Sequence, residues 1–338
     1  MVNASLKRVA KLLSLFFLLP FLVACSQPPL SHKQLTGFTM GTSYHLTVIG
    51  NGLDYEYLQI RVDARLEEIN RVFSTYIDDS ELSLLNQTST DRWLTLNPEL
   101  YLVLEQSLQL TSITGGAFDV TVGPLVNAWG FGPVKQTATP TEQQLNTLLT
   151  QVGSQHLELS EGRLYKHKNV YIDLSSVAKG YAVDQIALLL REQGVKNFMV
   201  EIGGELYVEG QSPRNTPWRV AIEKPGESYG EVHKAISLSN KAIATSGDYR
   251  NYYELEGKRY SHTINPVTGK PVVHGLASAT VVADDCATAD ALATALNVLG
   301  PEKGLALARE YQWAIYLIIK TDEGFQTLYS DAFKPYLD

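Results

Sequence analysis

The sequence predicts an α+β protein, built as one large domain with mixed or antiparallel sheets and flanking helices. Helical and strand patterns come in separate runs and not in strict βαβ alternation, which disfavours a doubly wound parallel sheet. Strand patterns dominate residues 197–283. We find no repeat, no low-complexity segment and no second hydrophobic span, and the loop at 133–142 is only a weak candidate boundary, so a single domain is expected.

The first half of the chain is mainly helical. Apolar residues at helical spacing, followed by glycine or introduced by Pro140-Thr141-Glu142, indicate where helices lie. Alternating apolar and polar residues between turn signals indicate strands. The expected helices are 55–73, 98–113, 140–152 and 177–193, and the expected strands are 43–49, 156–160, 163–166 and 169–173.

Short alternating or apolar runs mark most of the second half as strands. They are expected at 197–202, 205–209, 218–223, 234–238, 242–246, 252–256 and 277–283, with a last hairpin at 314–320 and 324–329. One helix, 284–299, interrupts them. Asp284 or Asp285 can cap its start, and Gly300-Pro301 ends it.

The 284–299 helix carries the most informative pair of residues, Asp290 and Thr294. Four residues apart, they share one face of the helix. A carboxylate and a hydroxyl can hold a hard cation such as Mg²⁺ when phosphate supplies other ligands. On spacing alone, an alanine-rich packing helix with a satisfied polar pair is the alternative.

The N-terminus is expected to be an export signal. A positive region with Lys7, Arg8 and Lys11 precedes the apolar run 12–23, which is too short for a spanning helix. Leu-Val-Ala-Cys at 22–25 resembles the bacterial lipobox, in which Cys25 is lipidated; an ordinary signal cut near Ala24 is the alternative. We therefore divide the chain into a lipoprotein-type signal peptide (1–24), a lipidated tether (25–36) and one domain (37–338).

Charge and cysteine content narrow the possible partners. Loss of the three cations of the signal takes the formal charge from −8 to −11, which argues against nucleic acid. The phosphate of a small cofactor must then be met by a metal and a few local donors. If Cys25 carries lipid, Cys286 is left without an intrachain partner and is expected to be a small buried residue. The chain has no Walker P-loop, no Gly-x-Gly-x-x-Gly after a strand and no Cys/His cluster.

Four further segments could carry chemistry, although each also has a plain structural interpretation. Residues 39–42 form a glycine turn, and 115–132 form a glycine-rich loop packed by aromatics. Residues 173–184 include a helix start, which presents free N–H groups to an anion. Residues 245–250 and 262–271 are polar loop segments among turn residues, a setting that is typical of binding loops.

In order, these segments resemble the ApbE family, the FAD:protein FMN transferases. The resemblance runs from about residue 36 to 299. Its combination of motifs is specific although each motif is weak alone: Gly-Ala-Phe-Asp-x-Thr-x-Gly-Pro at 116–124, Asp-Leu-Ser-Ser-Val-Ala-Lys-Gly-Tyr at 173–181, Glu-Ile-Gly-Gly-Glu at 201–205, His-Thr-Ile-Asn-Pro-x-Thr-Gly at 262–269, and Asp290-x-x-x-Thr294.

The resemblance implies a fold, a reaction and a set of site residues. The fold would be ApbE-like and related to the T-fold. With Mg²⁺ bound, a Thr or Ser hydroxyl of an acceptor protein would attack the FMN-side phosphorus of FAD, and AMP would leave. The implied flavin or adenosine contacts are Met40, Tyr76, Ala117, Phe118, Asp119, Asp173, Lys179 and Ile264. The implied magnesium ligands are the Ser176 carbonyl oxygen and the Asp290 and Thr294 side chains. Lys179 is at a position that the family varies.

A general base would help the incoming hydroxyl. His262 is the first candidate and Asp248 the second, and neither follows from spacing. Two other functions stay open: a Mg²⁺-dependent FAD pyrophosphatase, with water as nucleophile, and a non-catalytic flavin-binding lipoprotein.

The expected acceptors are periplasmic domains of membrane redox complexes, such as subunits of sodium-pumping NADH:quinone oxidoreductase and its Rnf relatives. We therefore expect a lipid anchor on the periplasmic side of the inner membrane. Ser26, directly after the lipidated cysteine, would also permit sorting to the outer membrane.

Overall fold

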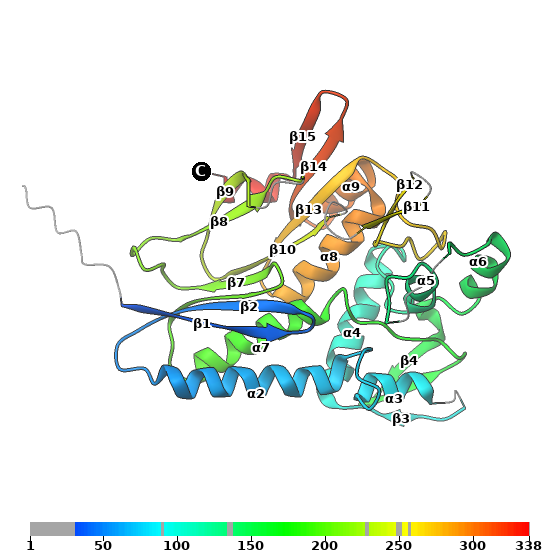
Figure 1. Cartoon of the computed structure of the whole chain (residues 1–338), viewed down its shortest axis with the longest axis horizontal. Helices are drawn as coiled ribbons and strands as arrows, with labels where there is room; N and C mark the ends of the chain where they lie inside the picture. The colour runs from blue at the N-terminus through cyan, green and yellow to red at the C-terminus, as the bar shows by residue number, and fades with distance from the viewer. Residues whose placement is uncertain are drawn as a thin grey trace, which may run out of the picture.

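An eight-stranded antiparallel sheet lies at the centre of this computed structural model (Figure 1). The structure describes residues 31–337, except 89–90, 134–137, 227–229, 248–251 and 256–257. Neighbouring strands of the sheet are antiparallel throughout. In spatial order they are β1 (His32–Thr39), β2 (Thr42–Ile49), β6 (Asn197–Ile202), β7 (Glu205–Glu209), β10 (Lys241–Gly247), β13 (Leu276–Ala283), β14 (Ala314–Thr321) and β15 (Gly324–Tyr329).

Helices cover one face of this sheet and enclose the larger core (Figure 1). The covering helices are α2 (Tyr55–Phe73), α7 (Ala178–Glu192) and α8 (Cys286–Leu299), and α4 (Pro98–Ile113) packs against α8. The sequence explains α2 directly. Its apolar residues, including Leu58, Val62 and Ile69, are buried on one face. Asp54 caps its start by accepting the N–H of Tyr57 at 3.0 Å.

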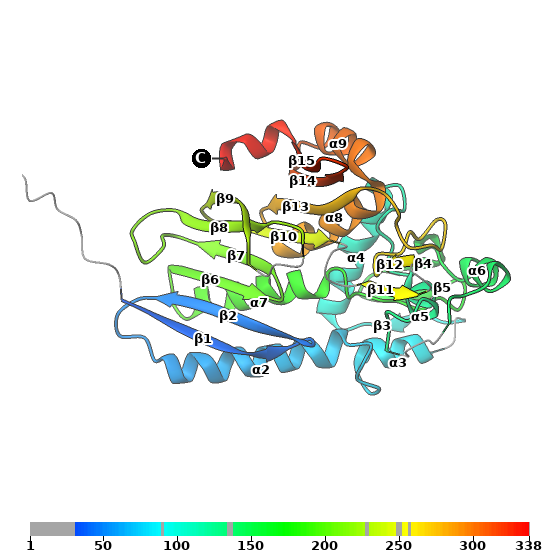
Figure 2. The same cartoon turned by 45° about the horizontal axis from the view of Figure 1, so that its top comes forward.

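A smaller core lies on the other face of the sheet. It forms beneath a two-stranded ribbon, β8 (Trp218–Glu223) and β9 (Val232–Leu238), and the short helix η3 (Asp331–Tyr336) (Figure 2). Trp218, Ile236 and Phe333 are buried there. Because both faces are covered, central strands such as β13 are buried along almost their whole length.

The remaining elements gather beside the α4 and α8 helices (Figures 1 and 2). A third cluster of buried apolar residues packs Leu125 and Trp129 with Leu145, Val152 and Ile264, whereas other buried residues of this region belong to the larger core. The elements are α3 (Glu81–Gln87), β3 (Leu94–Thr95), α5 (Gly123–Ala128), α6 (Glu142–Leu149), η2 (Ser154–His156), β4 (Leu157–Ser160), β5 (Arg163–Lys166), β11 (Tyr252–Leu255), β12 (Lys258–Ser261) and α9 (Pro301–Glu310).

The α+β prediction with antiparallel sheets in one domain is confirmed, with three local corrections. Residues 32–36, assigned to the tether, belong to β1, which pairs with β2 along its full length. Residues 169–173 are not a strand. Pro301 was interpreted only as a helix stop, but it is also the first residue of α9, a position that proline favours. None of the helices in the described part of the chain is both long and apolar enough to span a bilayer.

Candidate functional site

The predicted metal-binding helix α8 starts against helix α7. Asp285 caps it as expected, because its carboxylate accepts the N–H of Thr288 at 2.8 Å. Asp184 of α7 also accepts the N–H of Cys286, at 2.8 Å from one carboxylate oxygen and 3.0 Å from the other. The two helices are thus joined by polar contacts at the point where α8 begins.

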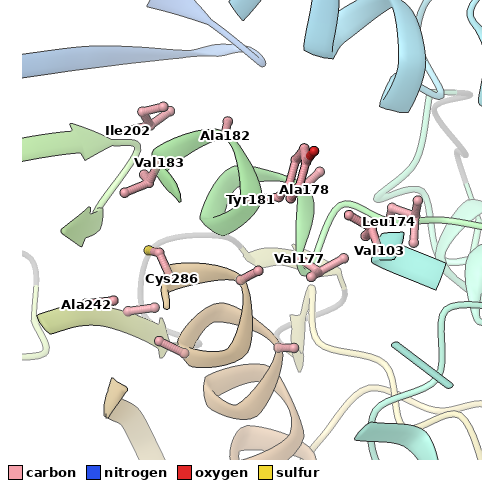
Figure 3. Packing of buried hydrophobic residues seen from close by; sticks show 14 of the residues in the cluster. Val103, Leu174, Val177, Ala178, Tyr181, Ala182, Val183, Ile202, Ala242 and Cys286 are labelled. Atoms are coloured by element: carbon pink, nitrogen blue, oxygen red, sulfur yellow. The ribbon is translucent and has the colours of Figure 1, made fainter. Parts of the chain in front are cut away.

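Asp290 makes the return contact from α8 to α7. Its Oδ2 accepts the N–H of Gly180 at 3.1 Å, in the first turn of α7, and the residue is only 6% exposed. The absence of a side chain at Gly180 permits this approach, since a Cβ there would lie 2.3 Å from the Cys286 carbonyl oxygen. Figure 3 shows the close packing of the two helices, with Cys286 beside Val183. Asp290 is therefore held at the positive end of the α7 dipole.

Lys179 and Glu205 complete a charged cluster at this junction. The Lys179 ammonium lies 2.6 Å from Glu205 Oε1, and Glu205 is 4% exposed at the start of β7. Glu205 Oε2 is buried without a hydrogen-bond partner in the described part of the chain. Two buried carboxylates, Glu205 and Asp290, thus share one ammonium ion, which leaves a surplus negative charge.

The pKa values of the three groups are shifted first by burial and then by their mutual charges. Burial raises the pKa of Glu205 to about 7, although Lys179 pulls it down and Asp290 adds to the rise. Burial also raises the pKa of Asp290, against the attraction of Lys179 and the Gly180 N–H. Burial alone would lower the pKa of Lys179, but Asp290 and Glu205 reverse this and raise it. We conclude that the ammonium stays charged and that the carboxylates lack positive charge.

These residues fit a hard divalent cation. Thr294 lies one turn after Asp290 on α8 and is half-buried, and Ser176 lies just before α7. No group of three or more His, Cys, Asp or Glu side chains arranged for a metal occurs among the described residues. The donors available are one carboxylate, a hydroxyl and a carbonyl, an oxygen set that suits Mg²⁺ bound together with phosphate. Among the described residues, no side-chain hydrogen bond joins Ser176 or Thr294 to Asp290, so these two ligands stay predictions.

The start of α7 differs from the sequence expectation in one detail. Neither Ser175 nor Ser176 caps the helix, because the capping position is Val177, which offers no side-chain acceptor. The Ser175 N–H is instead bound by Asp173 Oδ1 at 2.9 Å. The free N–H groups of α7 are thus left to other acceptors, of which Asp290 is one.

The turn that contains Met40 is linked to the charged cluster by the hairpin between β6 and β7, which packs against both. Met40 and Gly41 have φ values of +49° and +73°, which form the tight turn between β1 and β2. The hairpin residue Gly203 packs on the next residue of that turn, since a Cβ on Gly203 would lie 2.8 Å from Thr42 Cγ2 and 3.4 Å from Lys179 Cδ. Met40 itself is half-buried against the larger core.

The loop with Ala117, Phe118 and Asp119 is tied firmly to the protein. Ala117 and Phe118 are buried. Asp119 Oδ1 accepts bonds from the Thr121 N–H and hydroxyl and from the Ser154 hydroxyl, at 2.6–2.8 Å. Asp119 Oδ2 accepts the Ser154 N–H at 3.0 Å. The carboxylate of Asp119 is therefore used to build the loop.

Asp173 and Tyr76 lie near each other beside this loop. The Asp173 N–H donates to the Val120 carbonyl at 2.7 Å. Tyr76 is 67% exposed, and partial burial together with the Asp173 charge raises its pKa. An exposed aromatic ring beside a carboxylate is suited to a planar heterocycle with hydrogen-bonding groups. These two predicted flavin contacts thus lie near each other.

The loop that carries His262 is attached to α8 through Asn297. This fully buried residue donates to Ser246 Oγ at 3.1 Å and Thr263 Oγ1 at 3.4 Å. His262 is half-buried, and its ring meets that of Phe131 edge-on, with centroids 6.3 Å apart. One helix therefore carries Asp290 and also holds the loop of the candidate base. Asp248, the second candidate, lies outside the described residues, as does Cys25.

A second contact holds the far end of this loop. Trp129 Nε1 donates to the Gly269 carbonyl at 2.8 Å. Ile264 is buried beside Trp129 in the third apolar cluster. The glycine-rich segment and the polar loop, which are far apart in the sequence, thus lie side by side.

Sequence reasoning missed Glu205 and Asn297. Glu205 stood in the Glu-Ile-Gly-Gly-Glu motif without a role, and its position as a buried charge at a strand start was the available signal. Asn297 lies seven residues after Asp290 on the same face of α8, a spacing that could have marked it.

A cavity of about 460 Å³ lies elsewhere, between α4, α7 and the start of α8. Asp184, Arg191, Tyr207 and Asp285 are among its lining residues. None of the residues predicted to bind flavin or metal lines it. We therefore do not assign this cavity to the site described above.

Comparisons with known proteins agree with this arrangement. The model of the ApbE family matches residues 40–317. A FAD:protein FMN transferase from Vibrio cholerae is 44% identical over 320 residues, which are 94% of this chain and 96% of that protein. One from Haemophilus influenzae is 45% identical over 312 residues, 89% of this chain and 90% of that protein. The structure of the flavin transferase ApbE from Vibrio cholerae superposes with a TM-score of 0.86 at 43% identity, covering 91% of this chain and all of that one.

Proposed function

The chain belongs to the ApbE family, and from this premise we propose that it transfers the FMN half of FAD to a hydroxyl group of an acceptor protein. The bond between the FMN phosphorus and the bridging oxygen of the FAD diphosphate breaks, so AMP leaves with that oxygen. The acceptor oxygen forms the new bond to the FMN phosphorus. The observation that carries the proposal is the surplus negative charge around Asp290, at a helix junction shared by several motif segments.

We propose that Mg²⁺ is required, with Asp290, Thr294 and the Ser176 carbonyl as its protein ligands. Glu205 Oε2 is buried and has no hydrogen-bond partner among the described residues, and burial raises the pKa of Asp290; both observations support a missing positive charge at this place. When bound, the ion would supply Lewis-acid stabilisation of charge on the diphosphate. The protein's own part is positioning, on which phosphoryl transfer depends heavily.

We propose His262 as the group that accepts the proton of the attacking hydroxyl. Support comes from its place on a loop that Asn297 fixes to α8. Asp248 remains the second candidate. A His262→Asn variant is expected to slow transfer about 10²- to 10⁴-fold and to lose the pH dependence of a base. Unchanged transfer across pH would remove His262 from the mechanism.

The remaining site residues are proposed as flavin or adenosine contacts. Tyr76 offers an exposed ring. Gly203 lies close both to Lys179 and to Thr42, which is two residues after Met40. Asp173 and Ile264 are held on the two motif loops. Ala117, Phe118 and Asp119 have buried side chains, so the backbone of their loop is the part that we propose contacts the ligand.

We also propose that the chain is a lipoprotein anchored through Cys25 on the periplasmic side of the inner membrane. The support is the signal pattern of residues 1–25. The acceptors would be periplasmic domains of membrane redox complexes, with an exposed Thr or Ser.

Mass spectrometry of a candidate acceptor tests the function. The acceptor is mixed with the protein, FAD and MgCl₂, with EDTA in a parallel sample. We expect FMN on the acceptor only without EDTA. Free FMN in the absence of acceptor would favour a FAD pyrophosphatase instead. Unchanged FAD in every sample would favour a flavin carrier without activity.

A further inference from the structure

Lys179 creates an electrostatic problem for the proposed metal site. Lys179 directly precedes Gly180, whose N–H Asp290 accepts at 3.1 Å, so its ammonium ion is attracted to Asp290, the only acidic side chain among the proposed metal ligands. A lysine that neutralises a carboxylate weakens the attraction of that carboxylate for a divalent cation. A metal site beside Lys179 therefore needs something that balances the lysine.

Glu205 is placed to do this. It begins β7, directly after the Gly203-Gly204 turn, and its Oε1 lies 2.6 Å from the Lys179 ammonium. The glutamate side chain is 5% exposed and that of Lys179 is 29% exposed, so water screens their attraction only in part. The aliphatic part of Lys179 lies near Gly203, since a Cβ on Gly203 would lie 3.4 Å from Lys179 Cδ.

The net charge of the three groups shows what each one contributes. With Glu205, Lys179 and Asp290 all ionised, the cluster carries one surplus negative charge. Without the Glu205 charge, the remaining ammonium and carboxylate cancel. Without both Glu205 and Lys179 charges, Asp290 again supplies one negative charge. The affinity for Mg²⁺ should follow this sequence if charge decides it.

We propose that Glu205 is a charge-balancing residue: it holds Lys179 and so leaves Asp290 available to the metal ion. It acts through Lys179 and need not touch the ion. This inference rests on the proposed function, because it assumes that Asp290 is a metal ligand. Residues behind the ligands of a metal typically change its affinity 10- to 100-fold when replaced.

The test compares Glu205→Gln with the double variant Lys179→Met/Glu205→Gln. Melting temperature is measured against MgCl₂ concentration without acceptor, since a ligand that binds the folded state raises it. Because Lys179 is also a proposed flavin contact, FAD is added to each variant at a concentration that saturates it. We expect the half-saturating MgCl₂ concentration to rise about tenfold in Glu205→Gln. In the double variant it should return to within roughly threefold of the wild-type value.

Glu209→Gln is the matched control. Glu209 lies on the same strand and also pairs with a basic residue, Arg191. Its replacement should leave the magnesium titration unchanged. Melting temperatures in EDTA check that every variant is folded.

Two results would overturn the inference. One is a half-saturating MgCl₂ concentration for Glu205→Gln that equals the wild-type value. The other is a double variant that binds as weakly as Glu205→Gln or more weakly, which would mean that Glu205 acts through its shape and not its charge. Asp290→Asn separates this from the proposed function: if the magnesium response persists in that variant, the metal site itself is wrongly placed.

Discussion

Two buried aspartates in two motif regions have opposite surroundings. Asp119, in the loop before α5, accepts four hydrogen bonds from Thr121 and Ser154. Asp290, at the junction of α7 and α8, accepts one from Gly180 among the described residues. Both side chains are less than a tenth exposed.

The difference separates a carboxylate that builds the site from one that can bind a ligand. Four hydrogen bonds replace the water that Asp119 loses on burial, so the fold gains by burying it. On burial Asp290 exchanges its water for one N–H and the attraction of a lysine that it shares with Glu205. Its negative charge is therefore only partly compensated, and positive charge is in short supply. Under the proposed function, this shortage would favour a cation at Asp290. The resemblance assigns both residues to the site, and the structure shows that their carboxylates accept different numbers of hydrogen bonds.

The largest expected effect is on stability. Asp119→Ala leaves the N–H groups of Thr121 and Ser154 buried without acceptors, and should lower the free energy of unfolding by about 3–5 kcal/mol. Asp290→Ala should lower it by at most about 1 kcal/mol. The variant loses the hydrogen bond from the Gly180 N–H, but it also loses a buried charge that is only partly compensated. Urea unfolding in EDTA measures both.

Equal losses in the two variants would contradict the contrast. Asp119→Asn is the matched control, since its amide keeps one acceptor oxygen and the side-chain volume. It should fall between the wild type and Asp119→Ala.

The second prediction concerns pH. In the metal-free protein, burial raises the pKa of Glu205 from 4.5 to about 7. Between these values the folded protein binds more protons than the unfolded chain, so stability is greatest below about pH 4.5 for this group and is lost as the pH rises to about 7. The slope should reach at most about 1.4 kcal/mol per pH unit. Unfolding of Glu205→Gln across this range should show a flatter profile, while Glu209→Gln should keep the wild-type slope.

A smaller effect is expected at Gly180. A Cβ in Gly180→Ala would lie 2.3 Å from the Cys286 carbonyl oxygen and 2.8 Å from Ala287 Cα, and these backbone atoms cannot move aside. We expect a loss of about 1–3 kcal/mol, reduced by the roughly 1 kcal/mol by which alanine favours a helix. Gly304→Ala on α9 is the control, because its Cβ would meet the flexible end of Leu296 at 3.0 Å. It should be neutral or mildly stabilising in thermal unfolding, and a similar loss at both positions would show that the junction is not tightly packed.

The sequence predicted those elements whose signals are local. The helix at 55–73 follows from the spacing of its apolar residues, and the helix from Asp285 to Gly300 follows from its end residues. The strand β1 was missed because few of its residues are apolar and its stability comes from pairing with β2. Proline at 301 carries both a stop and a start signal, and only the tertiary structure decides between them.

The sequence could predict which residues belong to the site, but not how they contact one another. Asp290 and Thr294 were visible as a pair on one helix face. The contact of Lys179 with Glu205 was not, because it joins a helix to a strand across a hairpin. The sequence also did not show that the Asp119 carboxylate is fully hydrogen-bonded, because one of its partners, Ser154, lies 35 residues away in the chain. A motif gives the residue type, whereas the number of its hydrogen bonds depends on the fold.

The central claim is that Asp290, and not Asp119, is available to a cation. The most direct test measures the unfolding free energy of Asp290→Asn and Asp119→Asn with FAD present, once in EDTA and once in saturating MgCl₂. We expect Mg²⁺ to stabilise the wild type and Asp119→Asn but no longer to stabilise Asp290→Asn. Magnesium stabilisation that survives in Asp290→Asn and disappears in Asp119→Asn would contradict the claim.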